Sequence, residues 1–165
     1  MFDFKQNKLN NKNSFTVGII SDTHGRLPDS AVIAFAGSKL IIHAGDIGEP
    51  AILEKLGIIA PVFPVKGNMD KGVWTREIPD SEIVNEGAVS LYILHDVSRI
   101  DLDPAASGFS AVIFGHTHRP FIERQNGVLF INPGSATRPR GNYLPSVALL
   151  KVMDKSLEAQ LVTLY

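Results

Sequence analysis

The sequence predicts an α/β fold in which two mixed β-sheets pack together with helices on the outside. In the first half, short apolar runs alternate with helical segments, which is typical of parallel strands covered by helices. In the second half, pairs of apolar runs flank short turns, which indicates hairpins. Polar residues directly follow several of these runs, so the carboxyl ends of the predicted strands carry the side chains suited to chemistry.

The expected helices and strands follow from local sequence features. The first half is expected to hold strands at residues 16–20, 39–43 and 61–65 and helices at 28–37 and 51–56. Pro28 suits a first helical turn, and Gly37 and Gly57 suit helix ends. The second half is expected to hold strands at 82–85, 89–94, 111–114, 120–124, 128–131, 147–153 and 159–164. Residues 1–15, rich in Asn and Lys, are expected to be a disordered polar leader, and residues 16–165 a single domain.

Composition excludes several classes of function. The 165 residues are 44% apolar and 20% charged, with a net charge of −1, which gives no general attraction to nucleic acid or to an anionic membrane. The absence of cysteine excludes disulfides, thiolate metal sites and cysteine nucleophiles. No apolar run is long enough to cross a bilayer, and the first residues lack a secretory h-region. We therefore expect a cytoplasmic protein.

Five of the apolar runs end in Asp, Asn or His. These residue types are hard or borderline metal ligands, and a glycine precedes three of them. The candidate ligands are Asp22, His24, Asp46, Asn68, His95, His116 and His118. Seven ligands are too many for one tetrahedral centre but suit two divalent ions that share a bridging carboxylate. Two such ions, two aspartates and a bridging hydroxide leave a formal charge of about +1, which attracts phosphate oxygens.

The ordered set of motifs resembles the calcineurin-like metallophosphoesterase superfamily. The residues that carry the likeness are Asp22-x-His24, Gly45-Asp46, Gly67-Asn68, His95 and Gly115-His116-Thr117-His118. Ile131-Asn132-Pro133-Gly134-Ser135 with Arg138-Pro139-Arg140 further matches the YfcE-type phosphodiesterase branch. The resemblance implies a four-layer αββα sandwich and a dinuclear site. It implies that Asp22, His24 and His118 hold one metal, that Asn68, His95 and His116 hold the other, and that Asp46 bridges them.

Two positions depart from the pattern of this branch. Where the superfamily often has a histidine that protonates the leaving group, this chain has Met69, which cannot transfer a proton. General acid catalysis is typically worth about 10²–10⁴-fold, so acidic leaving groups are expected to be favoured. The branch usually has His-Gly-His where this chain has His95-Asp96-Val97, so Asp96 is expected to alter the substrate pocket.

The remaining polar residues are expected to play supporting roles. His43 is predicted to pack behind the ligands, and Asp70 to orient a neighbour by hydrogen bonding. Arg26 and Arg119 follow ligand motifs closely and are the predicted phosphate-binding residues, whereas Arg138 and Arg140 are interpreted as solvated surface. The loop 132–135 is expected to shape the rim or to support a ligand histidine.

The sequence therefore predicts a phosphoesterase that hydrolyses small phosphodiesters with a metal-bridging hydroxide. Asp46, Asn68 and His95 are expected to serve catalysis directly. Mn²⁺ is the expected metal, with Zn²⁺, Fe and Ni²⁺ as alternatives. A rival interpretation is a non-catalytic scaffold like the retromer subunit of similar fold, in which several ligand positions are replaced, and a nuclease ranks lower for lack of a basic groove. The resemblance also suggests a homo-oligomer, with a dimer as the expected form.

Overall fold

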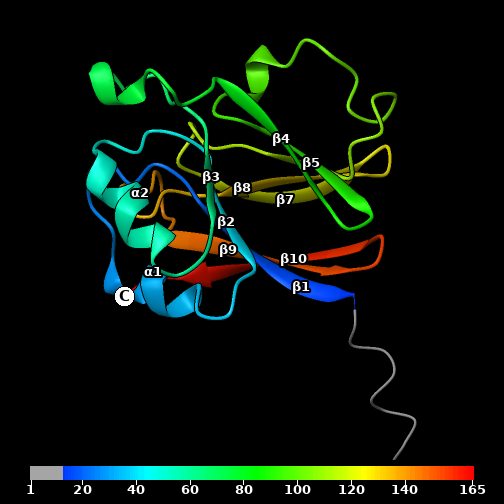
Figure 1. Ribbon diagram of the computed structural model, residues 1–165, viewed down its shortest axis with the longest axis horizontal. Helices are drawn as coiled ribbons and strands as arrows, with labels where there is room; N and C mark the ends of the chain where they lie inside the picture. Colours follow the sequence, from blue (N-terminus) through cyan, green and yellow to red (C-terminus); the bar gives the residue numbers. More distant parts are fainter. Residues whose placement is uncertain (1–12) are drawn as a thin grey trace, which may run out of the picture.

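The computed structural model describes residues 13–165 and contains two five-stranded β-sheets that pack face to face (Figure 1). The first sheet has the order β10-β9-β1-β2-β3, and the second β4-β5-β6-β8-β7. The strands of the first sheet are β1 (Ser14–Ile20), β2 (Leu40–His43), β3 (Val62–Pro64), β9 (Ser146–Met153) and β10 (Ser156–Thr163). Those of the second are β4 (Ser81–Glu86), β5 (Val89–Leu94), β6 (Ala111–Ile113), β7 (Pro120–Gln125) and β8 (Val128–Pro133).

Both sheets are mixed, as the sequence predicts. The parallel pairs are β1 with β2, β2 with β3, β5 with β6 and β6 with β8, and the other neighbours are antiparallel. The three expected hairpins are β4–β5, β7–β8 and β9–β10. The first sheet therefore contains the parallel set β1, β2 and β3, and the second contains the parallel set β5, β6 and β8. Parallel strands end at the same edge of a sheet, so the loops that follow the strands of each set emerge together.

The space between the sheets is filled by alternate side chains of the central strands. Ile19 and Ile42 of the first sheet and Ile93 and Ile113 of the second are fully buried in this cluster. The outer face of the first sheet is covered by α1 (Asp29–Ala34) and α2 (Pro50–Gly57), whose apolar side chains pack on Ile41 and its neighbours. The expected layered sandwich is therefore confirmed.

The outer layer over the second sheet is built differently from the first. Within the described residues 96–110, the only regular element is the short 3₁₀ helix η3 (Val97–Arg99). Side chains from this segment, including Ile100 and Phe109, cover Tyr92 and Val112, and the rings of Tyr92 and Phe109 stack at 5.0 Å. The fourth layer is thus an irregular covering. A second 3₁₀ helix, η2 (Val73–Thr75), follows β3.

Several boundaries differ from expectation by a few residues. Strand β1 begins at Ser14, because Ser14 and Phe15 pair with the end of β9, so these two residues belong to the sheet. Asn13, also part of the expected leader, donates a hydrogen bond to Oδ1 of Asp154 at 3.1 Å, and residues 1–12 lie outside the described residues. Helix α1 is shorter than expected. Across residues 13–165, no helix has the length and apolar character that a bilayer crossing requires.

Gly18 provides a test of how closely α1 packs on β1. A Cβ atom at this position would lie 2.6 Å from Cδ1 of the buried Phe35 ring. Gly18→Ala is expected to lower the free energy of unfolding by about 1–3 kcal/mol, because a fully buried ring has no free space into which to move. Urea unfolding measures this. The matched control is Gly57→Ala, where nothing lies within 4 Å, and equal stability of the two variants would contradict the packing described.

Candidate metal centre

The seven candidate ligands come from loops that leave the carboxyl ends of five strands. Asp22 and His24 follow β1, Asp46 follows β2, and Asn68 follows β3. His95 follows β5, and His116 and His118 follow β6. The two sheets therefore contribute from opposite sides, so the ligand groups meet over the end of the core that lies between the sheets.

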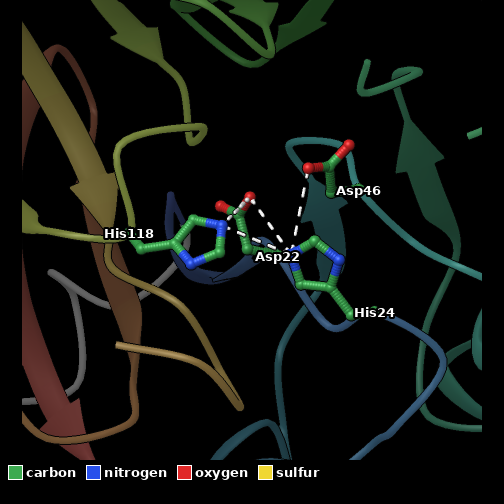
Figure 2. Close-up of side chains that lie close together, drawn as sticks. All are labelled: Asp22, His24, Asp46 and His118. Atoms are coloured by element: carbon green, nitrogen blue, oxygen red, sulfur yellow. Dashed lines mark hydrogen bonds and ion pairs between the residues drawn. The ribbon is translucent and has the colours of Figure 1, made fainter. Parts of the chain in front are cut away.

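Four of these side chains form a compact first group. One ligand atom from each of Asp22, His24, Asp46 and His118 lies within 4.8 Å of the other three. The imidazole Nε2 atoms of His24 and His118 are 3.3 Å apart, and Nε2 of His118 is 3.1 Å from Oδ1 of Asp22. Figure 2 shows the four side chains pointing toward a common centre.

The other three side chains form a second group beside the first. Oδ1 of Asn68 lies 3.1 Å from Nε2 of His95 and 3.1 Å from Nδ1 of His116. Asp46 joins the two groups, because its Oδ2 atom is 3.4 Å from Nε2 of His95 and 3.9 Å from Nε2 of His24. All seven predicted side chains thus lie in one neighbourhood, with Asp46 between the two groups.

The ligand loops hold unusual backbone conformations. Asp22, His24, Asp46, His116 and His118 all have positive φ, between 47° and 69°. For residues with a Cβ atom this region is disfavoured, and it persists only where the surroundings impose it. Strain gathered at these five positions shows that the fold holds their side chains in place at a cost in local stability.

The glycines that precede the ligands mainly leave room for neighbouring atoms, and only one of them is needed for its backbone conformation. At Gly67 a Cβ atom would lie 2.0 Å from Oδ1 of Asp46, and at Gly115 it would lie 1.9 Å from Oγ of Ser21. Of the three such glycines only Gly45, at φ 96°, adopts a conformation that side chains avoid. The sharp turn expected from these glycines is therefore a property of Gly45, whereas Gly67 and Gly115 allow neighbouring loops to approach closely.

Two of the four candidate ligand histidines, His95 and His118, are oriented so that Nε2 is free for a ligand. In His95, Nδ1–H donates to the Ala44 carbonyl at 2.7 Å, and in His118, Nδ1–H donates to the Arg138 carbonyl at 2.6 Å. In the neutral rings, the Nε2 lone pairs therefore face carboxylate or amide oxygens, which are also acceptors. Only a proton or a cation satisfies such an arrangement, and backbone-anchored imidazoles of this kind are typical metal ligands.

Asp22 gives the clearest sign that the site fits a cation. Its Oδ2 atom accepts hydrogen bonds from the Ser21 hydroxyl and from the His116 amide. Its Oδ1 atom is buried, and among the described residues it accepts no hydrogen bond. Since leaving a buried charged oxygen without a partner is costly, the donor set fits a metal ion placed between Asp22 and His118.

The pKa shifts report the same electrostatics. The Asp22 carboxylate raises the pKa of His118, while burial lowers the pKa of His24. Burial by itself would lower the pKa of His95, but its contacts with Asp46, Asp22 and the Ala44 carbonyl outweigh burial and raise it. Imidazoles drawn toward protonation by carboxylates occupy positions that favour positive charge.

His43 supports the site from behind, as predicted. Its fully buried ring donates from Nε2 to Oγ of Thr23 and accepts at Nδ1 from the Gly45 amide. The Thr23 hydroxyl in turn donates to the Ile47 carbonyl. Burial lowers the pKa of His43 to about 4, so the ring is neutral and ties the loop after β1 to the loop after β2.

Asp70 joins the loops after β2 and β3. Its carboxylate accepts three backbone hydrogen bonds, from the amides of Ile47 at 3.1 Å, Gly48 at 2.9 Å and Gly67 at 2.9 Å. The Met69 amide, one residue earlier, donates to Oδ1 of Asp46 at 2.9 Å. Asp70 therefore orients its neighbours as expected, and Met69 leaves Oδ2 of Asp46 free to face both groups.

The loop after β8 supports the ligand loops from the other side. The Ser135 hydroxyl donates to the Asp22 carbonyl at 2.8 Å, and that of Thr137 donates to the Thr23 carbonyl at 3.1 Å. The Asn132 amide donates to the Gly115 carbonyl at 2.9 Å. The expectation that residues 132–135 support the ligands is thus matched, and Thr137 extends this support.

The arginines are placed differently from the sequence-based interpretation. A cavity of about 350 Å³ over the ligands is lined by Arg138 and Arg140, so these two are not merely solvated surface. Arg26 is exposed and is not among the residues that line this cavity, while Arg119 lines an adjoining cavity. Arg138 and Arg140 belong to the motif that resembles the YfcE-type branch, but no role at the site is expected of them from sequence because they follow no ligand motif. The path of the loop after β8 brings them over the site.

The two positions that depart from the family pattern also lie at the site. Met69 lines the cavity over the ligands, and 61% of its side chain is exposed. Asp96 accepts hydrogen bonds from Ser98 at the start of η3, and its Oδ2 atom lies 3.9 Å from Nε2 of His116. Asp96 therefore places negative charge at the edge of the second group.

Comparison with known proteins identifies the class. The family model of the calcineurin-like phosphoesterase superfamily domain matches residues 15–155, so the chain belongs to this superfamily. It is 34% identical over 158 residues to a protein named a probable metallophosphoesterase from Methanothermobacter thermautotrophicus, covering 88% of this chain and 91% of that one. A protein named a probable metallophosphoesterase from Methanocaldococcus jannaschii is 37% identical over 159 residues, covering 88% and 80%. The phosphodiesterase YfcE of Escherichia coli is 25% identical over 155 residues, covering 79% and 84%.

Solved structures agree on the fold. A structure titled as a novel archaeal phosphodiesterase superimposes with a TM-score of 0.75 at 24% identity and covers 89% of this chain and 99% of its own. The structure of vacuolar protein sorting 29 from Cryptosporidium parvum superimposes with a TM-score of 0.74 at 20% identity, and the match covers 91% of this chain and 97% of that one. The predicted family, fold and enzyme class, a hydrolase of ester bonds, are confirmed.

Asp70 provides a test of how the ligand loops are held together. Asp70→Asn replaces an acceptor oxygen by an N–H₂ group that faces a backbone N–H, and it removes the charge. We expect the free energy of unfolding to fall by about 2 kcal/mol and Mn²⁺ to bind more weakly. Urea unfolding and metal titration measure the two effects, with Asp101→Asn as the exposed control. A variant indistinguishable from this control would refute the positioning role.

Proposed function

We propose that this chain is a phosphodiesterase that works with two divalent cations held by the seven side chains. In this proposal, Asp22, His24 and His118 would hold one ion, Asn68, His95 and His116 would hold the other, and Asp46 would be shared by both. The observation that carries the proposal is the arrangement around Asp46, whose Oδ2 atom faces both Nε2 of His95 and Nε2 of His24. When bound, the ions supply an activated water for attack on phosphorus and neutralise charge on the phosphoryl oxygens.

The chain's own residues perform the remaining steps. Arg138 and Arg140 line the cavity over the ligands, where their guanidinium groups hold the phosphodiester anion against the centre. Asp46, Asn68 and His95 fix the position at which the phosphoryl group reacts. Met69 occupies the place of a proton donor and donates none, so the leaving oxygen departs without protonation from this position. Mn²⁺ is the proposed metal, because mixed oxygen and nitrogen ligands suit it.

A scaffold without catalysis is the second candidate. Structural likeness to vacuolar protein sorting 29 proteins supports it, but at 20% identity that likeness describes the fold alone. The full set of seven ligand side chains favours catalysis. Metal-loaded protein that leaves every phosphodiester intact would favour the scaffold. The dimeric state and the cytoplasmic location expected from the sequence stay predictions.

Removal of a shared ligand tests the assignment. Asp46→Asn and His95→Ala are each expected to lower kcat/KM for an activated aryl phosphodiester by about 100-fold or more, because the first replaces the shared carboxylate by a neutral amide and the second removes an imidazole ligand. Rates with saturating Mn²⁺ measure this, and circular dichroism verifies that the variants fold. Asp101→Asn, an exposed aspartate, is the control. Wild-type activity in both ligand variants would refute the proposal.

Restoring a proton donor tests the role of Met69. Met69→His places an imidazole in the cavity over the ligands, where the exposed side chain has room. We expect hydrolysis of a diester with a poor alkoxide leaving group to rise by about 10²-fold, and that of a p-nitrophenyl diester to change little. Met69→Gln, polar but unable to act as an acid, is the control. An equal effect of Met69→His on both substrates would remove the leaving-group argument.

A further inference from the structure

The cavity next to the candidate metal centre has four Phe and Tyr rings among its eleven lining residues. It has a volume of about 660 Å³, and its rings belong to Phe114, Phe121, Phe130 and Tyr143. Phe121 lies on β7 and Phe130 on β8, while Phe114 follows β6 and Tyr143 lies in the loop after β8. The second sheet and the loop that supports the ligands thus build this aromatic cavity together.

The aromatic cavity is continuous with the centre. His116 and Arg140 line both this cavity and the cavity over the ligands. His116 also borders a third cavity of about 540 Å³, whose lining includes Lys66, Asp80 and Asp96. The cavity over the ligands therefore adjoins a polar cavity at His116 and the aromatic cavity at His116 and Arg140.

Two of the four rings are exposed to solvent, Phe121 at 36% and Tyr143 at 49%, whereas Phe114 is buried, with 6% exposed. The Phe114 and Phe121 rings are 6.2 Å apart at an interplanar angle of 52°, so they form an angled wall. A planar ring placed against this wall removes apolar surface from water and gains edge-to-face contacts that an alkyl group lacks. Arg119 and Arg140 in the same lining supply guanidinium planes that stack on rings and attract phosphate.

We infer that the aromatic cavity binds an aromatic ester group of the substrate, so that the enzyme acts on phosphodiesters carrying an aryl ring or a nucleobase. The inference rests on the proposed function, because the metal centre is what holds the phosphoryl group beside the rings. Gln125 in the lining offers an amide to the polar edge of a base.

Calorimetric titration of the Mn²⁺-loaded protein with phosphonates tests the inference without turnover. Phenylphosphonate and methylphosphonate present the same anion with and without a ring. We expect phenylphosphonate to bind about tenfold more tightly to the wild type. In Phe121→Ala and Tyr143→Ala, we expect the ratio of phenylphosphonate affinity to methylphosphonate affinity to fall by about threefold or more. The affinity for methylphosphonate itself is expected to stay unchanged. Ile58→Ala, which removes an 86% exposed apolar side chain outside the cavity, is the control.

The outcomes separate the two proposals. A thymidine phosphonate that binds more tightly than phenylphosphonate assigns the cavity to a nucleobase, and the reverse assigns it to an aryl group. Equal affinity of the wild type for both simple phosphonates, or a ring preference that survives both substitutions, would overturn the inference and leave the rings as a docking surface for another protein. Ring-dependent binding without hydrolysis of any diester would overturn the proposed function instead, while hydrolysis without ring preference would leave that function standing.

Discussion

The structure depends on one unfavourable arrangement, in which acceptor atoms from separate loops face one another at the end of a dry core. The Nε2 atoms of His95 and His118 point toward oxygens of Asp46 and Asp22, and Oδ1 of Asp22 is buried without a hydrogen bond among the described residues. Such a cluster is costly without positive charge between its members. The proposed pair of cations would convert the same contacts into ligand bonds, and the binding energy of the ions would offset the cost of gathering the side chains.

Holding that arrangement requires rigid loops, and polar bridges between the loops supply the rigidity. Asp70 and His43 link the loop after β2 to its neighbours, and Ser135 anchors the loop after β1. Positive φ angles at ligands such as Asp22 and His116 show that these bridges and the packing beneath them overcome local backbone preference. The core between the sheets therefore serves as a platform for a strained and highly polar edge.

The two sheets and the positions of the candidate ligands were predictable, because the pattern of apolar residues in a strand and the polar residues that follow it are local features of the sequence. The runs that became β1, β2 and β5 predicted both the sheets and the positions of Asp22, Asp46 and His95. What sequence could not predict depends on the paths of loops through space. The covering of the second sheet by an irregular segment follows from tertiary packing of side chains such as Phe109. The placing of Arg138 over the ligands, and the aromatic cavity beside them, likewise arise from loop geometry that no periodicity encodes.

The proposed site holds two cations joined by Asp46, and counting bound ions is its most direct test. The protein is loaded with Mn²⁺, freed of excess metal by gel filtration, and measured by elemental analysis against protein concentration. A dinuclear site predicts two ions for each wild-type chain and a clear loss of bound metal in Asp46→Asn. Wild-type protein that retains no metal, or a variant that retains both ions with unchanged affinity, would contradict it.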